Sequence, residues 1–168
     1  INLKGAESVA QEIRAKGGKA VAMEADISKE EDSLRMAEEV MQRYGKVDIL
    51  INNAGLWHGV HARPWDAWTV DEWDRMLAVN LRGTWLCCKA IAPLMVRQSS
   101  GKIINIASNV VKEREPQFFL PYALSKVGVY ALTQSLAAAL GPCGINVNAI
   151  APGPTATEAT LAMPDSDK

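Results

Sequence analysis

Short strand-like runs alternate with longer helical patterns along this chain, and that alternation restricts the fold more than any other feature. The strand-like runs cover residues 19–25, 47–52, 102–107 and 144–150. The helical patterns cover residues 5–16, 28–44, 71–98 and 121–140. Strands joined through helices pair in parallel, because each connection returns the chain by a right-handed crossover. The sequence therefore predicts an α/β fold: a doubly wound, Rossmann-like parallel sheet covered by helices on both faces, in a single domain over residues 1–168.

Capping patterns predict where the helices begin. In a capping box, a hydroxyl and a carboxylate three residues apart satisfy amides at a helix N-terminus. Two pairs with this spacing precede predicted helices, Ser28 with Glu31 and Thr69 with Glu72. Gly45 is a stop signal for the helix that Ser28 would open. We expect the pattern that Thr69 opens to run as one helix to about Gln98.

The composition excludes several kinds of partner. The chain is 48% hydrophobic and 22% charged with a formal net charge of −1, so it has no basic surface for nucleic acid. No apolar run reaches the roughly 18 residues that cross a bilayer, so we expect no membrane partner and a cytoplasmic location. Cys87, Cys88 and Cys143 lack the spacing of disulfide frameworks or zinc sites, which makes packing their expected role and a metal site unexpected.

A polar or turn-forming residue follows each predicted strand. These residues are Asp26, Asn52, Ser108 and Pro152. The carboxyl ends of parallel strands meet at one edge of the sheet, where the ligands of such folds bind. Each residue taken singly is more often a plain strand end or turn residue. Together they predict a binding edge.

Tyr122 and Lys126 form the pattern with the most direct chemical meaning. Residues at i and i+4 lie on one face of a helix, so the phenol and the ammonium can reach one small site. A free tyrosine titrates near pH 10, about three units too high for proton transfer at neutrality. An ammonium about 4 Å away supplies about 4 kcal/mol at an effective dielectric near 20, which is enough. Alone, the pattern is more often an ordinary exposed pair.

Five separated motifs give this pair a context. They are Asn52-Asn53-Ala54-Gly55, Asn80 within Val79–Gly83, Ser108, Tyr122 with Lys126, and Pro152-Gly153. In this order, over essentially all 168 residues, the chain resembles the classical short-chain dehydrogenase/reductase family. The resemblance implies an oxidoreductase that uses NAD or NADP to interconvert a secondary alcohol and a ketone. NAD is favoured, because residues 1–3 resemble the stretch after an acidic residue that binds the adenosine ribose.

The resemblance implies catalytic roles for four residues. Tyr122 would be the acid when a carbonyl is reduced and the base when an alcohol is oxidised. Ser108 would hydrogen-bond the reacting oxygen. Lys126 would favour the ionised phenol and hold the nicotinamide ribose, and Asn80 would anchor a water in the proton relay.

The resemblance also implies a set of cofactor contacts besides Tyr122 and Lys126. Thr157 matches a threonine that holds the nicotinamide carboxamide. The matching residues are Asp26 and Ile27 for the adenine, Asn52, Ala54 and Gly55 beside the adenine ribose, and Pro152, Gly153, Thr155 and Thr157 after the last strand.

Substrate contacts are expected from the loops around these motifs. The candidates are Trp57, His58, Asn109, Phe118 and Phe119, with His61 near them. An apolar or aromatic substrate is favoured. For the two phenylalanines, packing in the core is an equal alternative to substrate contact. For His58 and His61, a position in a surface loop is favoured over substrate contact. Asn109 is an alternative to Ser108 as the residue that orients the substrate. The nearest alternative activity is that of a 3-oxoacyl-[acyl-carrier-protein] reductase.

The chain departs from the family pattern at both ends. The glycine-rich turn and the ribose-binding acidic residue would precede Ile1, and the sequence stops soon after Thr157. We therefore expect a sheet and a cofactor site that are incomplete at both ends, and a non-catalytic fragment or assembly partner is the alternative of another class. The interval from Ser108 to Tyr122 is one residue longer than the commonest family spacing. When complete, such a protein is expected to form a homotetramer through the helices predicted at 71–98 and 121–140.

Overall fold

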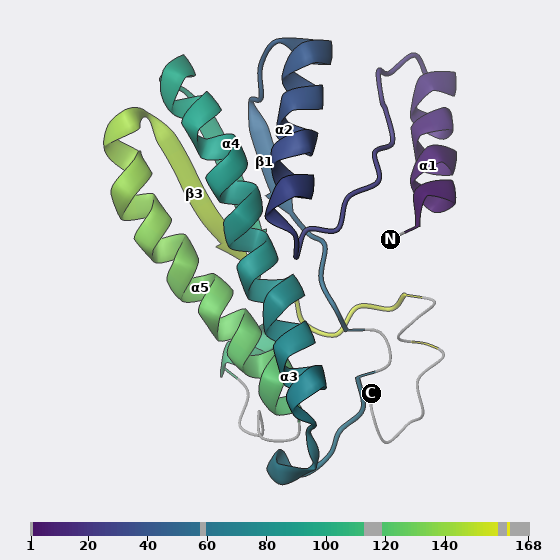
Figure 1. The fold of residues 1–168 in the computed structure, drawn as a ribbon, viewed down its shortest axis with the longest axis vertical. Helices are drawn as coiled ribbons and strands as arrows, with labels where there is room; N and C mark the ends of the chain where they lie inside the picture. The colour runs from purple at the N-terminus through teal and green to yellow at the C-terminus, as the bar shows by residue number, and fades with distance from the viewer. Residues whose placement is uncertain (1, 58–59, 113–118, 158–160, 162–168) are drawn as a thin grey trace.

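A computed structural model describes residues 2–57, 60–112, 119–157 and 161 of the chain (Figure 1). The principal elements in these ranges are helices α1 (Leu3–Ala15), α2 (Glu30–Tyr44), α3 (Val70–Leu77), α4 (Thr84–Gln98) and α5 (Leu120–Leu140) and strands β1 (Ile49–Asn52), β2 (Gly101–Ile106) and β3 (Ile145–Ile150). A π-helical segment, η2 (Ala78–Gly83), joins α3 to α4. Short 3-10 helices occur at Trp65–Ala67, Asn109–Lys112 and Gly141–Cys143.

The three strands form a parallel sheet in the order β1-β2-β3. Leu50 pairs with Ile103, and Ile103 pairs with Val147, so these residues share one face of the sheet. Helices α4 and α5 pack on that face, and α2 packs on α4 (Figure 1). The α/β class and the parallel sheet are confirmed.

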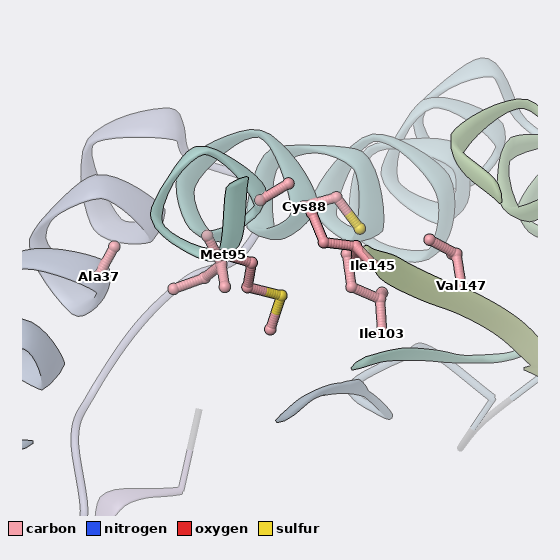
Figure 2. Packing of buried hydrophobic residues seen from close by; sticks show 8 residues of the cluster. Ala37, Cys88, Met95, Ile103, Ile145 and Val147 are labelled. Carbon is pink, nitrogen blue, oxygen red and sulfur yellow. The ribbon is translucent and has the colours of Figure 1, made fainter. Parts of the chain in front are cut away.

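The hydrophobic core lies between this sheet face and the helices. Met95 of α4 and Ile103 of β2 are fully buried, with Ile145 of β3 beside them (Figure 2). Each such side chain contributes about 1.5–3 kcal/mol relative to leaving it exposed. Cys88 belongs to the same cluster, and burial raises its pKa to about 12, so the thiol stays protonated. All three cysteines are free, with Cys87 also buried and Cys143 half-buried, which agrees with the expected packing role.

The prediction of helices on both faces is not met by the described residues. On the face away from α4 and α5, Ile49 is 54% exposed and Ile51 is 59% exposed. Helix α1 stands apart from the sheet (Figure 1). The helices that pack on the sheet within the described part of the chain therefore cover one face only.

The strand predicted at 19–25 is also wrong for the described structure, where this segment has no regular secondary structure. Strand β1 pairs with β2, and in the described residues no ladder hydrogen bonds join residues 19–25 to its other edge. Two arginines bind the segment instead. The Arg14 guanidinium donates to the Ala20 carbonyl (2.8 Å), and the Arg35 guanidinium donates to the Glu24 carbonyl (2.7 Å).

One predicted capping box is confirmed and the other is wrong. The Thr69 hydroxyl accepts from the Glu72 amide, and the Glu72 carboxylate accepts from the Thr69 amide. These bonds and the Arg63 guanidinium lower the pKa of Glu72 to about 2. Helix α2 instead begins after Lys29, one residue later than the pattern predicts, without a side-chain cap, and the Ser28 hydroxyl donates to the Asp26 carboxylate. The predicted stop at Gly45 is confirmed by its left-handed backbone, φ 74°.

The helix predicted over 71–98 is broken where the candidate Asn80 lies. Residues Ala78–Gly83 widen into a π-helix between α3 and α4. The Thr84 hydroxyl donates to the Asn80 carbonyl (2.8 Å), and Gly83 lies so close to Ile27 that an added Cβ would be 2.9 Å from its side chain. A π-helical turn of this kind often marks a functional site.

No helix in the described ranges is long and apolar enough to cross a membrane.

Candidate functional site

Helix α5 presents Tyr122 and Lys126 near its N-terminus, as their spacing predicts. Lys126 is only 7% exposed, and its ammonium donates to the carbonyl of Ile106 at the end of β2 (2.8 Å). The same nitrogen is 5.8 Å from the centre of the Tyr122 ring. Burial lowers the pKa of Lys126, because the charged form loses hydration. The pair therefore lies at the carboxyl edge of the sheet with a partly desolvated cation beside the phenol ring.

Gly55 gives this cation a close backbone neighbour. A Cβ built on Gly55 would lie 3.6 Å from the Lys126 nitrogen and 3.2 Å from the Asn80 side-chain oxygen. The loop after β1 can approach both side chains because it has no side chain at this position. Three of the predicted site residues are thus brought together, one each from the β1 loop, η2 and α5.

Asn80 holds the β1 loop through both ends of its amide. Its oxygen accepts from the Leu56 amide (2.6 Å), and its nitrogen donates to the Leu56 carbonyl (3.1 Å). The same nitrogen lies 3.1 Å from the Met76 sulfur and 3.1 Å from the Ser125 hydroxyl oxygen. Asn80 is buried, and these contacts fix its side chain against three separate parts of the chain. The predicted role in holding a water stays a prediction.

An aromatic cluster forms beside the candidate acid. The Trp57 ring lies 4.5 Å from the Tyr122 ring and 5.3 Å from the Phe119 ring, tilted by 51° in both cases. These are ordinary distances for favourable aromatic pairs. Trp57 is half-buried, so the cluster combines packing with a partly open surface.

Ser108 and Asn109 follow β2 at the same edge. The Ser108 hydroxyl oxygen accepts from the Val110 amide (3.3 Å) and lies 3.5 Å from the Asn109 side-chain oxygen. The Asn109 amide donates to the Pro152 carbonyl (2.9 Å), which ties the ends of β2 and β3 together. Two predicted strand-end residues, Ser108 and Pro152, are therefore neighbours of Asn109.

Asn52 has a different environment from the rest of its motif. Its side-chain nitrogen donates to the side-chain oxygen of Asn105 (2.8 Å) and lies 3.2 Å from the Cys88 sulfur. Asn105 is fully buried and donates to the Thr133 hydroxyl (2.9 Å). The Asn52 amide group thus points into the protein between β2 and α4, whereas Ala54 and Gly55 are exposed.

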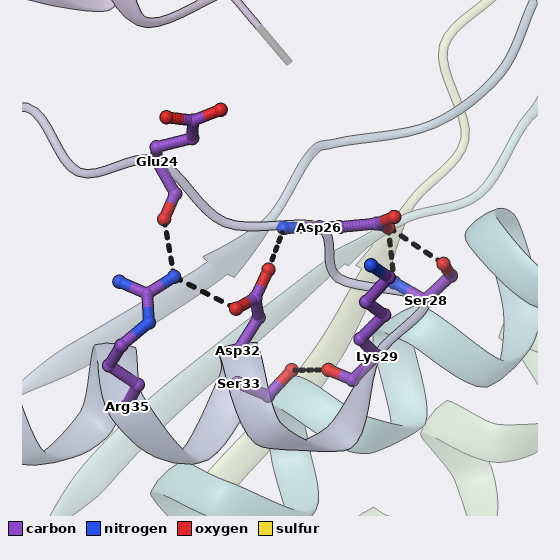
Figure 3. A network of polar contacts seen from close by, with 7 residues as sticks. All are labelled: Glu24, Asp26, Ser28, Lys29, Asp32, Ser33 and Arg35. Carbon is purple, nitrogen blue, oxygen red and sulfur yellow. Dashed lines mark hydrogen bonds and ion pairs between the residues drawn. The ribbon is translucent and has the colours of Figure 1, made fainter.

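Asp26 and Ile27 lie near η2 rather than beside Tyr122. The Asp26 carboxylate accepts from the amide and hydroxyl of Ser28, and these bonds lower its pKa (Figure 3). The Asp26 amide donates to the carboxylate of Asp32 in α2 (2.7 Å). Ile27 packs against Gly83, which places the pair at the end of η2 that follows Asn80.

The segment after β3 is open. Pro152, Gly153, Thr155 and Thr157 are exposed, and the Thr155 hydroxyl donates to the Gly153 carbonyl (3.1 Å). Gly153 lies near Asn109, because its added Cβ would be 3.6 Å from the Asn109 side-chain nitrogen. His58 and Phe118 lie outside the described residues.

Sequence reasoning missed two buried polar residues that organise this edge, Ser125 and Asn105. Ser125 is three residues after Tyr122, so helical spacing alone places it on the same side of α5. Asn105 belongs to an otherwise apolar strand, where a buried amide requires a partner.

A groove lies elsewhere on the described part of the molecule. It has a volume of about 740 Å³ and contains none of the predicted site residues. It lies between α3, η2, α4 and α5 and is lined by Asp74, Arg75, Leu77, Ala78, Leu81, Arg82, Trp85 and Leu132. Its lining is mainly apolar, with Asp74, Arg75 and Arg82 among its residues, and fits a packing surface better than a reaction site. In the described parts of the chain, no group of three or more His, Cys, Asp or Glu residues could hold a metal ion.

Comparison with known proteins gives consistent results. The chain matches the family model described as short chain dehydrogenase over residues 1–167. It is 37% identical over 163 residues to the 3-oxoacyl-[acyl-carrier-protein] reductase FabG of Staphylococcus epidermidis, covering 97% of this chain and 65% of that protein.

Two solved structures show the same likeness in three dimensions. One is an NAD⁺-bound xylitol dehydrogenase, with a TM-score of 0.83 and 34% identity over 89% of this chain and 56% of that one. The other is a gluconate 5-dehydrogenase from Burkholderia cenocepacia J2315 in complex with NADP and tartrate, with a TM-score of 0.85 and 33% identity over 95% of this chain and 61% of that one. The chain spans less than two thirds of the length of each of these three relatives.

Proposed function

Because this chain belongs to the short-chain dehydrogenase family, we propose that it carries the catalytic part of an oxidoreductase acting on a secondary alcohol or ketone with NAD or NADP. The observation that carries the proposal is the buried Lys126 ammonium, which lies beside the Tyr122 ring and is bonded to the end of β2. Among the described residues no carboxylate is paired with this ammonium, and a buried cation without such a partner is costly for a fold. A role in lowering the energy of a phenolate explains why it is there.

The described residues fit a nicotinamide cofactor at its reactive end. One of the three Lys126 protons goes to the Ile106 carbonyl, which leaves donors for a ribose hydroxyl. Gly55 offers an exposed backbone next to that ammonium. When bound, the nicotinamide supplies hydride transfer, and the protein supplies orientation and proton transfer. We infer that Asp26 and Ile27 lie toward the adenine end, with Thr155 and Thr157 toward the carboxamide.

The proton chemistry is assigned to α5 and the end of β2. Tyr122 would donate its proton to a carbonyl oxygen, or accept one from an alcohol, with the Lys126 ammonium stabilising the phenolate. Ser108 would donate to the same substrate oxygen, since its own oxygen already accepts from the Val110 amide. Asn109 lies within reach of Ser108 and is the second candidate for this contact.

The aromatic cluster supports an apolar or aromatic substituent on the substrate. Trp57 contacts the Tyr122 ring on one side and the Phe119 ring on another, so a substrate oxygen that reaches the phenol has apolar surface nearby. The identity to a 3-oxoacyl-[acyl-carrier-protein] reductase supports a β-ketoacyl thioester as the second candidate. Among the described residues we identify none that would bind the 2′-phosphate that distinguishes NADP from NAD. NAD remains our first choice, from the sequence alone.

We also propose that assembly uses the outer faces of α4 and α5. Trp85 on α4 and Leu124, Val127 and Tyr130 on α5 are large apolar or aromatic side chains exposed to solvent. The groove of about 740 Å³ lies over the same helices. A homotetramer would cover this surface. Light scattering should give a tetramer for the protein and a smaller species for Val127→Glu, and Ser8→Glu, at an exposed site on α1, should not change the mass.

The test of the function is cofactor binding followed by turnover. Titration with NADH and with NADPH should quench tryptophan fluorescence, because Trp57 lies beside the proposed nicotinamide site. Aliphatic and aromatic secondary alcohols, their ketones and a β-ketoacyl thioester should then be compared by cofactor absorbance. Absence of both binding and turnover would favour the alternative, a non-catalytic fragment or assembly partner. A cytoplasmic location stays a prediction from the sequence.

A further inference from the structure

Ser125 is a fully buried hydroxyl between the two proposed catalytic residues of α5. Its exposure is 0%, and its position is one residue before Lys126 and three after Tyr122. The hydroxyl donates to the Tyr122 carbonyl (2.7 Å), and its oxygen accepts from the Asn80 side-chain nitrogen (3.1 Å). The hydroxyl proton and one lone pair are therefore both engaged inside the protein.

These two bonds connect the three segments that build the site. Asn80 lies on η2, and its side chain hydrogen-bonds both the amide and the carbonyl of Leu56 in the β1 loop. Leu56 stands between Gly55, which approaches Lys126, and Trp57, which packs on Tyr122. The Ser125 hydroxyl is thus the point where α5 is joined to η2, and through η2 to the β1 loop.

A second contact one turn along α5 supports the same alignment. Gly128 lies so close to Leu81 of η2 that an added Cβ would be 2.8 Å from a methyl group. The apolar contact at Gly128 sets how close the two helices come, and the directional bond at Ser125 sets how α5 is rotated. Rotation matters most for Tyr122 and Lys126, because errors of about 1 Å in a reacting group can cost about 100-fold in rate.

We propose that Ser125 is a positioning residue for the Tyr122–Lys126 pair, acting by holding the first two turns of α5 against Asn80 and the Leu56 loop. This inference rests on the proposed function, since it concerns the same site. Ser125 is too deeply buried to touch substrate, so it acts only through its neighbours. A purely structural serine would change stability and leave the chemistry of the folded protein unaltered.

The experiment compares Ser125→Ala with Ser135→Ala in the full protein. Ser135 is an exposed serine on the same helix whose hydroxyl also donates back to a helix carbonyl, Ala131 (3.1 Å), so it is a matched control. Ser125→Cys serves as a second variant with similar volume and a weaker donor, in case the alanine variant does not fold. Measurements are kcat, KM and the pH profile of kcat, together with hydrogen exchange of the Leu56 amide.

For Ser125→Ala we expect kcat to fall by about 10-fold or more, with KM changed less than about twofold. The limb of the kcat profile that reports the base should move to higher pH, because a displaced ammonium stabilises the phenolate less. The Leu56 amide should exchange faster, because Asn80 loses its anchor on α5. Ser125→Cys should give values of kcat, pH profile and Leu56 exchange between those of Ser125→Ala and wild type. Ser135→Ala should match wild type in all three.

Wild-type kcat, pH profile and Leu56 exchange in folded Ser125→Ala, or in folded Ser125→Cys if the alanine variant does not fold, would overturn the inference. So would a loss of activity that only follows the loss of folded protein. A wild-type protein without turnover would instead defeat the proposed function. Hydrogen exchange of the Leu56 amide would still test whether Ser125 connects α5 to the β1 loop. An unchanged exchange rate in Ser125→Ala would refute that connection.

Discussion

The sheet-facing side of α5 and the segment that leads from α1 into α2 satisfy their polar groups in contrasting ways. On α5, Ser125 and Lys126 are buried, and their partners include groups 45 and 20 residues away in the sequence. In the N-terminal segment, the ion pair of Arg14 with Glu7 and the bonds of Asp32 are local and more exposed.

This difference has an energetic consequence. A buried polar group that loses its partner costs about 1–3 kcal/mol, whereas an exposed ion pair is typically worth about 0–1 kcal/mol. Long-range partners also fix one element against another, which local pairs cannot do. Substitutions on the α5 side should therefore change both function and stability, and those in the N-terminal segment should change little. The following experiments test that contrast in order of expected effect.

The largest effect is expected for Tyr122→Phe, which should abolish turnover. The phenylalanine ring can keep the packing on Trp57, but it carries no proton, and general acid–base catalysis is worth about 10²–10⁴-fold. Affinity for NADH or NADPH should stay near that of wild type. Tyr44→Phe, at the exposed end of α2, is the matched control. Retained activity in Tyr122→Phe would refute the assigned mechanism.

A large effect is also expected for Gly55→Ala. The new methyl group would be 3.2 Å from the Asn80 oxygen, and Asn80 is held too firmly by Leu56 to retreat freely. We expect kcat/KM to fall about 10-fold or more and unfolding to become easier by about 1–3 kcal/mol. Gly141→Ala is the control, because its added Cβ meets nothing within 4 Å. If Gly55→Ala and Gly141→Ala had the same kcat/KM and stability, the β1 loop would not be packed closely against Asn80 and Lys126.

Asn105→Ala should have an intermediate effect that is mainly on stability. The change leaves the Asn52 amide with the Cys88 sulfur as its remaining side-chain partner and removes a donor to Thr133. Denaturant unfolding should show a loss of about 1–3 kcal/mol. Asn146→Ala, on an exposed site of β3, should stay within about 0.5 kcal/mol of wild type. A neutral result at Asn105 would mean that the buried amide pair does not hold β1 to β2.

The smallest effect is expected for Asp32→Asn, which tests the N-terminal side. The Asp26 amide and the Arg35 guanidinium lower the pKa of Asp32 below its ordinary value of 3.8. A lowered pKa stabilises the fold above the ordinary value, and this stabilisation is lost as the pH falls through the folded value. The wild type should therefore melt slightly above Asp32→Asn at pH 7, and the gap should narrow as the pH drops below about 4. If Asp32→Asn lost more stability at pH 7 than Asn105→Ala, the contrast between the buried α5 side and the N-terminal segment would be refuted.

Predictions from sequence succeeded where the signal was local. Tyr122 and Lys126 share a face of α5 because helical geometry is independent of context. Strands β1 and β3 form within predicted runs, and β2 begins one residue before its predicted run. The Thr69 cap formed because its partner Glu72 is three residues away. The roles assigned to these residues remain proposals.

Predictions failed where the expected pattern competed with another partner, which in some cases is near in the sequence and in others distant. The Ser28 pattern matches a capping box, but in the structure the Ser28 hydroxyl donates to the Asp26 carboxylate. Residues 19–25 have strand-like composition, but in the described structure the segment pairs with no strand, and Arg14 and Arg35 bind two of its carbonyl groups. The π-helical turn at Asn80 has no sequence signature, because it depends on Leu56 and Ser125 from other parts of the fold.

The sequence by itself determined the α/β class, the parallel pairing and the presence of a tyrosine–lysine pair at a strand edge, because periodicity, caps and motif order are written in neighbouring residues. Only the tertiary structure decided that Asn52 points inward, that Asn80 grips Leu56 and that Ser125 joins α5 to η2. Buried polar groups take whichever partner the packed chain brings within hydrogen-bonding distance, and that partner can be any residue in the sequence.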